Sequence, residues 1–235
     1  MNMKLCSKAH WLIFLALFSA CSLDEDNKDL QIFSKDYDFS ESEHGWKPGF
    51  ADYPAGPDSA LFELKYDYTD QVASILTKKS LMLQGNNLNR DLFMYLKKKV
   101  DRLEPNREYT ITFSVELASN CSSLSTDSQG SVYLKAGAVN NEPFSLIEGG
   151  NYVMNIDKGD DAVAGQDVIS MGDIVTANKN SGYVLLTRNN TMANSRYVAR
   201  TDANGELWLI IGTDSNLEGT TTLFYTRVNV VFSAS

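Results

Sequence analysis

Apolar and polar residues alternate with a period of two along much of the chain beyond residue 60. In the clearest run, residues 109–117, large apolar side chains occupy the odd positions, and threonine, serine and glutamate the even ones. Residues 62–68, 132–138 and 223–230 repeat the pattern, the last with a change of phase part-way along. Such alternation predicts half-buried β-strands, with one face toward a core and the other toward water.

Two further segments complete the predicted strands. Residues 207–211 are continuously apolar, which indicates a central strand that is covered on both faces. Residues 91–100 have the composition of a helix or a strand; the segment is short, has no capping box and lies between strand-like runs, so a strand is favoured. Turn-forming residues lie between these segments, and roughly ten closely spaced strands predict one all-β sandwich.

The N-terminus has the layout of a bacterial secretory signal. Lys4 and Lys8 supply positive charge, residues 11–18 are apolar, and Ser19 and Ala20 precede Cys21. The apolar run is too short to span a membrane, which takes ~20 residues. Residues 17–21 resemble a lipobox, so residues 1–20 are predicted to be a lipoprotein signal peptide and Cys21 the lipidated first residue. The alternative is an ordinary signal, with Cys21 an incidental thiol.

Residues 21–30 are predicted to form a flexible tether ahead of a single β-sandwich domain at 31–235. The residues after Cys21 are acidic and lack periodicity, so they are either a plain linker or a tag that sends lipoproteins to the cell surface. The expected location is the outer membrane, anchored by lipid and facing the cell surface or the periplasm.

Charge and residue counts exclude several classes of function. The signal holds two of the 21 basic side chains and none of the 30 acidic ones, which leaves the mature chain at a net charge of −11. Such a chain repels phosphate backbones, so nucleic-acid binding is not expected. Beyond Cys21 only Cys121 remains, so no disulfide can form within the mature chain. His44 is the last histidine, which excludes a histidine-rich metal site.

The order of motifs resembles the galactose-binding-like superfamily of jelly-roll sandwiches, which includes many carbohydrate-binding modules. The motifs are Asp38-Phe39 followed by Gly45-Trp46, then the segments 80–83 and 103–113, and two long C-terminal strands. Within it, the chain looks closest to uncharacterised secreted bacterial proteins that share segments like 45–54 and 131–137. The resemblance implies a two-sheet antiparallel jelly-roll. Many carbohydrate-binding members hold a structural calcium with paired acids near the C-terminus, but here Arg227 stands in that stretch and would repel a cation.

Five aromatic residues are candidates for stacking on sugar rings. They are Trp46, Phe50, Tyr53, Tyr66 and Tyr68. The first three lie in a proline-containing segment that could instead fold over one end of the sandwich and plug the core. This second interpretation is favoured for the segment, because the tryptophan that matches Trp46 in the resembling families is usually buried.

A turn with three carboxylates, Asp157, Asp160 and Asp161, is the candidate calcium site. Calcium prefers six to eight oxygen ligands, so the residue types fit, although acidic turns are common in a chain this negative. No other cofactor is expected. Residues 202–206 also carry alternate oxygens, but Asn204-Gly205 favours a hairpin turn over a metal site.

The sequence predicts a non-catalytic protein. It contains no nucleophile elbow, phosphate-binding glycine loop or zinc helix. A Cys121–His44 dyad is less favoured than an ordinary thiol in a loop. The leading function is a cell-envelope lipoprotein whose sandwich binds a ligand, most plausibly carbohydrate. The alternatives are an adhesion or envelope-structural protein without a small ligand and, third, a glycan-active enzyme.

Overall fold

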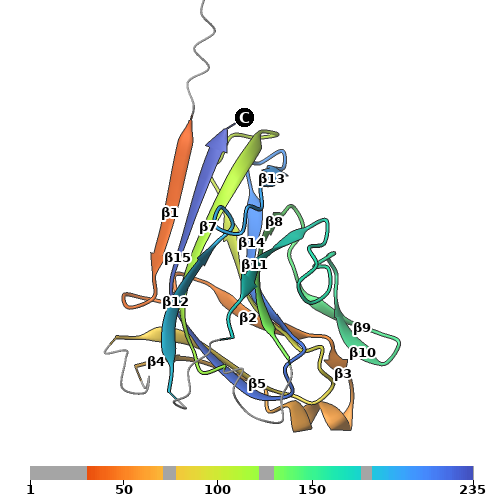
Figure 1. The fold of residues 1–235 in the computed structure, drawn as a ribbon. Coiled ribbons are helices and arrows are strands. Elements are labelled where there is room, and N and C mark those ends of the chain that lie inside the picture. Colours follow the sequence, from red (N-terminus) through yellow and green to blue (C-terminus); the bar gives the residue numbers. More distant parts are fainter. Residues whose placement is uncertain (1–30, 71–77, 122–129, 176–181, 235) are drawn as a thin grey trace, which may run out of the picture.

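Antiparallel strands in two packed sheets account for nearly all of the regular structure (Figure 1). The structure is a computed structural model that describes residues 31–70, 78–121, 130–175 and 182–234. The predicted signal peptide, Cys21 and the tether lie outside the described residues. No helix in the described part of the chain is both long and apolar enough to cross a membrane.

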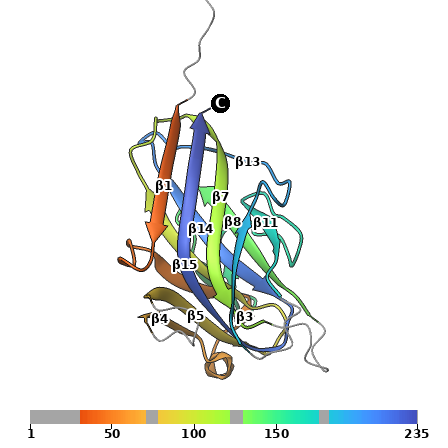
Figure 2. The ribbon, with the colours of Figure 1, turned by 60° about the vertical axis from the view of Figure 1, so that its left-hand side comes forward.

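The larger sheet has seven strands with β15 and β7 at its centre, where they lie side by side with β1 (Figure 2). One edge of β7 pairs with β12 and β13, while β15 pairs with β1 along its C-terminal half and with β5, then β4, along its N-terminal half. The strands are β1 (Ile32–Asp38), β4 (Lys65–Thr69), β5 (Ser80–Asn87), β7 (Glu108–Ser119), β12 (Val184–Asn189), β13 (Tyr197–Arg200) and β15 (Gly219–Ala234).

The second sheet has five strands in the order β11-β8-β14-β6-β2. They are β2 (Lys47–Ala51), β6 (Phe93–Val100), β8 (Val132–Val139), β11 (Val168–Asp173) and β14 (Leu207–Ser215). The chain passes repeatedly between the sheets, for example from β5 to β6 to β7 to β8. This arrangement confirms the predicted antiparallel, two-sheet jelly-roll β-sandwich, and β6 confirms the choice of strand over helix.

A main hydrophobic core fills the space between the two sheets. The odd-numbered residues of β7 from Tyr109 to Leu117 are buried and the even-numbered ones are not, as the alternation predicted. In β15 the register shifts between Tyr225 and Arg227, so the buried positions change phase there. The bulge lets one long strand keep its apolar side on the core along both halves.

The outer face of the five-stranded sheet is covered as well. A second apolar cluster contains Phe93, Tyr95 and Ile210, and Met154 and Ile156 pack against it. Met154 ends a small sheet formed by β3 (Tyr53–Pro54), β9 (Ser145–Glu148) and β10 (Asn151–Met154), and Ile156 follows in the loop to β11. Central strand β14 is therefore buried on both faces, as its continuous apolar run predicted.

The predicted strand at residues 62–68 begins later than expected. Pro57–Phe62 form a 3-10 helix, η1, and β4 starts only at Lys65. Phe62 is buried in the core from this helix, and Glu63 ends it in the left-handed conformation (φ 47°). Alternation alone could not distinguish a short 3-10 turn followed by a strand from one continuous strand.

Candidate functional site

A buried ion pair lies on the outer face of the five-stranded sheet. Lys135 of β8 and Asp214 of β14 are both 0% exposed, and Lys135 Nζ lies 3.0 Å from Asp214 Oδ2. Lys135 also donates hydrogen bonds to the backbone oxygens of Lys158 and Val163, at 2.9 and 3.0 Å. Its ammonium group thereby attaches the loop between β10 and β11 to the sheet.

Lys158, from that loop, extends the ion pair into a network. Its Nζ lies 2.8 Å from Asp214 Oδ2 and 2.9 Å from Asp52 Oδ2, and 5.1 Å from the centroid of the Phe93 ring. Asp52 follows β2 in a left-handed conformation (φ 62°), which aspartate tolerates better than larger residues. Two lysines and two aspartates thus balance in charge within a largely dehydrated site.

Burial shifts the pKa values of several groups in the network. Burial raises the pKa of Asp52 despite the attraction of Lys158, and it lowers the pKa of Lys135. Burial also lowers the pKa of Lys158, but the attraction of the Asp214 and Asp52 carboxylates is stronger, so the pKa of Lys158 is raised overall. Asp91, at the edge of the network, has its pKa raised to about 6 by partial burial and by the neighbouring Asp52.

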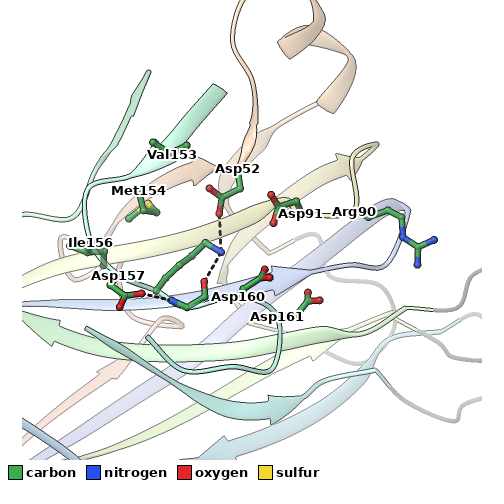
Figure 3. A pocket seen from close by; sticks show the side chains of 11 residues that line it. Asp52, Arg90, Asp91, Val153, Met154, Ile156, Asp157, Asp160 and Asp161 are labelled. Atoms are coloured by element: carbon green, nitrogen blue, oxygen red, sulfur yellow. Dashed lines mark hydrogen bonds and ion pairs between the residues drawn. The ribbon is translucent and has the colours of Figure 1, made fainter. Parts of the chain in front are cut away.

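A pocket of about 560 Å³ opens above this network. Figure 3 shows Val153, Met154 and Ile156, with Asp157 below them, on one side of the pocket, and three carboxylates and Arg90 on the other, with Asp52 between them. The three carboxylates belong to Asp91, Asp160 and Asp161. The pocket therefore offers an apolar strip facing a row of hydrogen-bond acceptors.

Three of these carboxylates could in principle hold a cation. Within the described residues, Asp52, Asp91 and Asp214 form the one group whose ligand atoms all lie within 4.8 Å of one another. The ammonium group of Lys158 already lies within 3 Å of two of them, at 2.8 and 2.9 Å. A metal ion here would be repelled by Lys158. The lysine ammonium group therefore takes the place of a metal ion in balancing the negative charge of these carboxylates.

The predicted calcium residues all line the pocket, but two of them make hydrogen bonds that hold the loop together. Asp157 accepts hydrogen bonds from the backbone nitrogens of Gly159 and Gln166, both at 3.0 Å, and these lower its pKa. Asp161 Oδ2 accepts a hydrogen bond from the Asn216 side chain at 2.8 Å. Asp160 contributes its carboxylate to the pocket lining.

Trp46 cannot serve as a stacking platform, which corrects its place among the candidate ligand-binding residues. It is 3% exposed, and its ring packs edge-on against Tyr37 and Phe39 within the main core. The favoured interpretation, that Trp46 plugs the core, is confirmed.

The other four aromatic candidates are not brought together. Phe50 and Tyr53 are partly buried against the core, and Tyr53 stacks on Tyr152 with ring centroids 4.7 Å apart. Tyr66 and Tyr68 lie on β4 in the other sheet, where Tyr66 donates a hydrogen bond to Glu43. These residues are absent from the lining of the 560 Å³ pocket, and also from that of a second hollow of about 390 Å³ beside β13.

The structure also shows the contacts of His44 and Cys121, the weighed catalytic dyad, and of Arg227. His44 packs on Tyr37 and Phe39, whereas the buried thiol of Cys121 contacts Thr221, so their contacts are with different parts of the core. Arg227 of β15 donates a hydrogen bond from Nε to Asp36 of β1 at 2.8 Å. This guanidinium pairs the N-terminal and C-terminal strands, where the resembling families often hold calcium.

The residues of the ion network were not predicted from the sequence. Two signals were present: Lys135 interrupts the apolar strand 132–138, and Asp214 stands at the end of the apolar run that begins at Leu207. Charged residues in strands that are buried on both faces need partners, because an unpaired buried charge is costly. Those partners, Lys158 and Asp52, come from loops that alternation does not describe.

No protein-family model matches the chain, and no curated protein matches it. The mannan-recognising carbohydrate-binding module TmCBM27 aligns at 14% identity and a TM-score of 0.42, covering 86% of this chain and 98% of that module. The CBM22-1 xylan-binding domain of Paenibacillus barcinonensis Xyn10C aligns at 14% identity and 0.38, covering 85% and 94%.

The enzymatically active domain of bacteriophage CBA120 tailspike protein 4 aligns at 11% identity and a TM-score of 0.38. That match covers 78% of this chain but only 19% of the tailspike chain. At these identities and TM-scores, the likenesses assign neither a family nor a ligand to the protein.

Proposed function

We propose that the protein is a non-catalytic carbohydrate-binding module whose binding site is the pocket above the ion network. The observation that carries this proposal is the division of the pocket into an apolar strip and a row of carboxylates. A sugar ring has the matching character, since its CH groups suit an apolar wall and its hydroxyls donate to carboxylate oxygens. The volume of about 560 Å³ also falls in the usual range for small-ligand sites.

A glycan-array screen of the purified protein tests this function. We expect binding of neutral or amino sugars rather than sulfated or uronic-acid glycans, because the accessible lining is rich in carboxylates. Asp91→Asn should weaken binding by about tenfold, the loss of roughly one charge-assisted hydrogen bond. The matched control is Asp67→Asn, an exposed aspartate on β4 in the other sheet. Absence of binding to any glycan would refute the proposal.

Calcium belongs to the same test. A calcium site at Asp157, Asp160 and Asp161 was predicted from the sequence, and all three residues line the pocket. Repeating the array with calcium and with a chelator separates the alternatives. If glycan binding is equal in both conditions, calcium plays no part in it; if it is lost with chelator and also in Asp160→Asn, the acidic loop is a calcium-dependent site.

We also propose that Cys21 carries lipid and anchors the protein in the outer membrane. The support is the sequence of residues 1–21, and the acidic residues that follow favour display at the cell surface. Mass spectrometry of the N-terminal peptide should show a diacylated Cys21. Cys21→Ser should release the protein from the membrane fraction, and protease treatment of whole cells would distinguish the surface from the periplasm.

An adhesive function without a small ligand is favoured by one separate observation. The β9–β10 hairpin and its approach expose Phe144 (47%), Leu146 (36%) and Ile147 (61%), and exposed apolar groups of this kind often mark protein contacts. Ile147→Lys should then reduce adhesion of cells that display the protein. Under the carbohydrate-binding proposal, the same variant retains glycan binding.

A further inference from the structure

The ion network holds an amine against a carboxyl group, with a second carboxyl beside the amine. Lys158 Nζ lies 2.8 Å from Asp214 Oδ2 and 2.9 Å from Asp52 Oδ2. The side chains of Lys158, Asp214 and Asp52 are only 9%, 0% and 12% exposed. We propose that Lys158 and Asp214 condense spontaneously into an intramolecular amide bond, which fixes the β10–β11 loop to strand β14.

Asp52 is placed to carry the protons of this reaction. Amide formation needs a neutral amine, and the Asp52 carboxylate is the group next to Lys158 Nζ that can accept its proton. Burial raises the pKa of Asp52, which favours the transfer, whereas Asp214 and Asp52 raise the pKa of Lys158 and oppose it, so the transfer depends on the direct contact between the two groups. A carboxylate oxygen of Asp52 also lies within 4.8 Å of one on Asp214, a short path for returning the proton.

Lys135 activates the carboxyl group that is attacked. Its ammonium lies 3.0 Å from Asp214 Oδ2 and is fixed by the backbone oxygens of Lys158 and Val163. A positive charge held at this oxygen stabilises the negative charge that develops there during attack on Cγ. Asp214 Oδ1 is buried without a hydrogen-bond partner among the described residues, which leaves it to take up protons and depart as water.

The atoms and charges of the reaction balance without any further reactant. Asp52 removes one proton from the Lys158 ammonium, and Nζ forms a bond to Cγ of Asp214. Asp52 passes protons from nitrogen to the departing oxygen, the C–O bond breaks, and one water leaves. Of the three ammonium protons, one remains on the amide and two leave in the water, while Asp52 returns to its carboxylate form.

The fold supplies the driving force that such a reaction lacks in water. Ammonium and carboxylate ions are well solvated in water, whereas a dehydrated site favours the uncharged amide over the ion pair. Holding the reacting atoms in contact can also raise their effective concentration to about 10⁵–10⁸ M. The adjacent pocket gives the released water a way out.

The bond would brace a sandwich whose one cysteine within the described residues, Cys121, is free. It would join residues 56 positions apart, one in the loop that lines the pocket and one on the central strand of the five-stranded sheet. A cross-link across so long a segment restricts the unfolded chain as a disulfide does. The pocket walls would then keep their shape when the rest of the domain is stressed.

Tryptic peptide mapping of the full, purified protein tests the proposal. Trypsin cannot cut after an acylated lysine, so residues 136–179 should remain uncut at Lys158 and be joined to residues 201–227. The joined peptide should be lighter than its two parts by one water molecule. If folded protein yields only the separate peptides 136–158, 159–179 and 201–227, the proposal is overturned.

Variants identify the role of each group. Lys158→Arg keeps the charge but should abolish the joined peptide. Asp52→Asn should slow joining by roughly 10²–10⁴-fold, so that freshly purified variant gives the separate peptides. Lys97→Arg, in a separate ion pair with Glu142, is the matched control and should leave joining intact. A peptide 108–158 uncut at Lys135 and joined to 201–227 would instead overturn the assignment to Lys158. If a variant fails to fold, the peptide map of the wild-type protein still decides.

Discussion

At the scale of single residues, Lys135 shows how a fully buried charge stabilises this fold through its partners. Lys135→Ala would remove one of the two ammonium groups that balance the buried negative charge of Asp214. It would also leave the backbone oxygens of Lys158 and Val163 without the hydrogen bonds that Lys135 donates. We expect the free energy of unfolding, measured by urea denaturation, to fall by about 3–5 kcal/mol. Lys99→Ala, which removes an exposed surface pair with Glu206, is the control. If both variants lost the same free energy of unfolding, burial of the ion network would add nothing to the stability of the protein.

Asp91 gives stability a dependence on pH. Its pKa in the folded protein is raised to about 6, mainly by partial burial, so folding favours the protonated carboxyl. The contribution of Asp91 to stability is therefore present below the pKa of the unfolded chain and is lost as the pH rises through about 6. Asp91→Asn removes this loss, so the variant should gain stability relative to wild type between about pH 4 and pH 7. Thermal melts across that range measure it, and Asp67→Asn should run parallel to wild type.

Individual residues also mark the limit of what the sequence could predict. The sequence suggested that segment 45–54 matters, yet Trp46 enters the core and Asp52, which received no attention, enters the ion network. Aromatic type alone does not reveal whether a ring faces solvent. Nor does spacing along the chain reveal that Asp52, Lys135, Lys158 and Asp214 meet, because they come from four separate segments of the fold.

At the scale of elements, alternation predicted the strands because each of them has one side on the core. It succeeded for β7 and located the change of phase in β15; it also found β8, but that strand is buried on both faces from Leu134 to Ala138 and is not half-buried as expected. It failed at residues 62–64, where a 3-10 helix buries Phe62 in place of a strand. The small β9–β10 hairpin also escaped prediction, because it lies on the outside of the sandwich and keeps Leu146 and Ile147 exposed.

The bulge in β15 gives a prediction at this scale. Deleting Thr226 would remove the extra residue that shifts the register between Tyr225 and Arg227. Arg227 would then follow Tyr225 directly and still face solvent, and Val228 would still face the core, so that the alternation becomes regular along the whole strand. Because the same side chains stay on the core, we expect the deletion variant to keep one cooperative unfolding transition, followed by circular dichroism during heating.

Thr226→Ala is the matched substitution for this deletion. It removes the hydrogen bonds from the Thr226 hydroxyl to Glu116 but keeps the residue count and therefore the register. We expect only a small decrease in melting temperature. A deletion variant that loses cooperative unfolding while Thr226→Ala keeps it would contradict this prediction and show that β15 needs the bulge itself.

At the scale of the whole molecule, the two sheets stabilise one another through a shared core. That core takes side chains from the seven-stranded sheet, such as Phe113 and Val230, and from the five-stranded sheet, such as Leu209 and Leu134. The same five-stranded sheet carries the ion network on its other face, opposite the core. The site therefore rests on a layer whose position depends on the packing of both sheets, so folding and formation of the pocket are coupled.

This coupling predicts one cooperative unfolding transition for the described sandwich. Trp46 lies in the core between the sheets, and Trp208 lies on the central strand β14. Their fluorescence should change at the same urea concentration as the β-sheet circular dichroism, because neither sheet can keep its apolar face dry alone. In protein that lacks residues 1–20, and with them Trp11, Trp208→Phe isolates the signal of Trp46 and should leave the two midpoints coincident. If Trp46 fluorescence changes well before the circular dichroism, the sheets separate before they unfold, and residues 31–235 do not behave as the single domain that the sequence predicts.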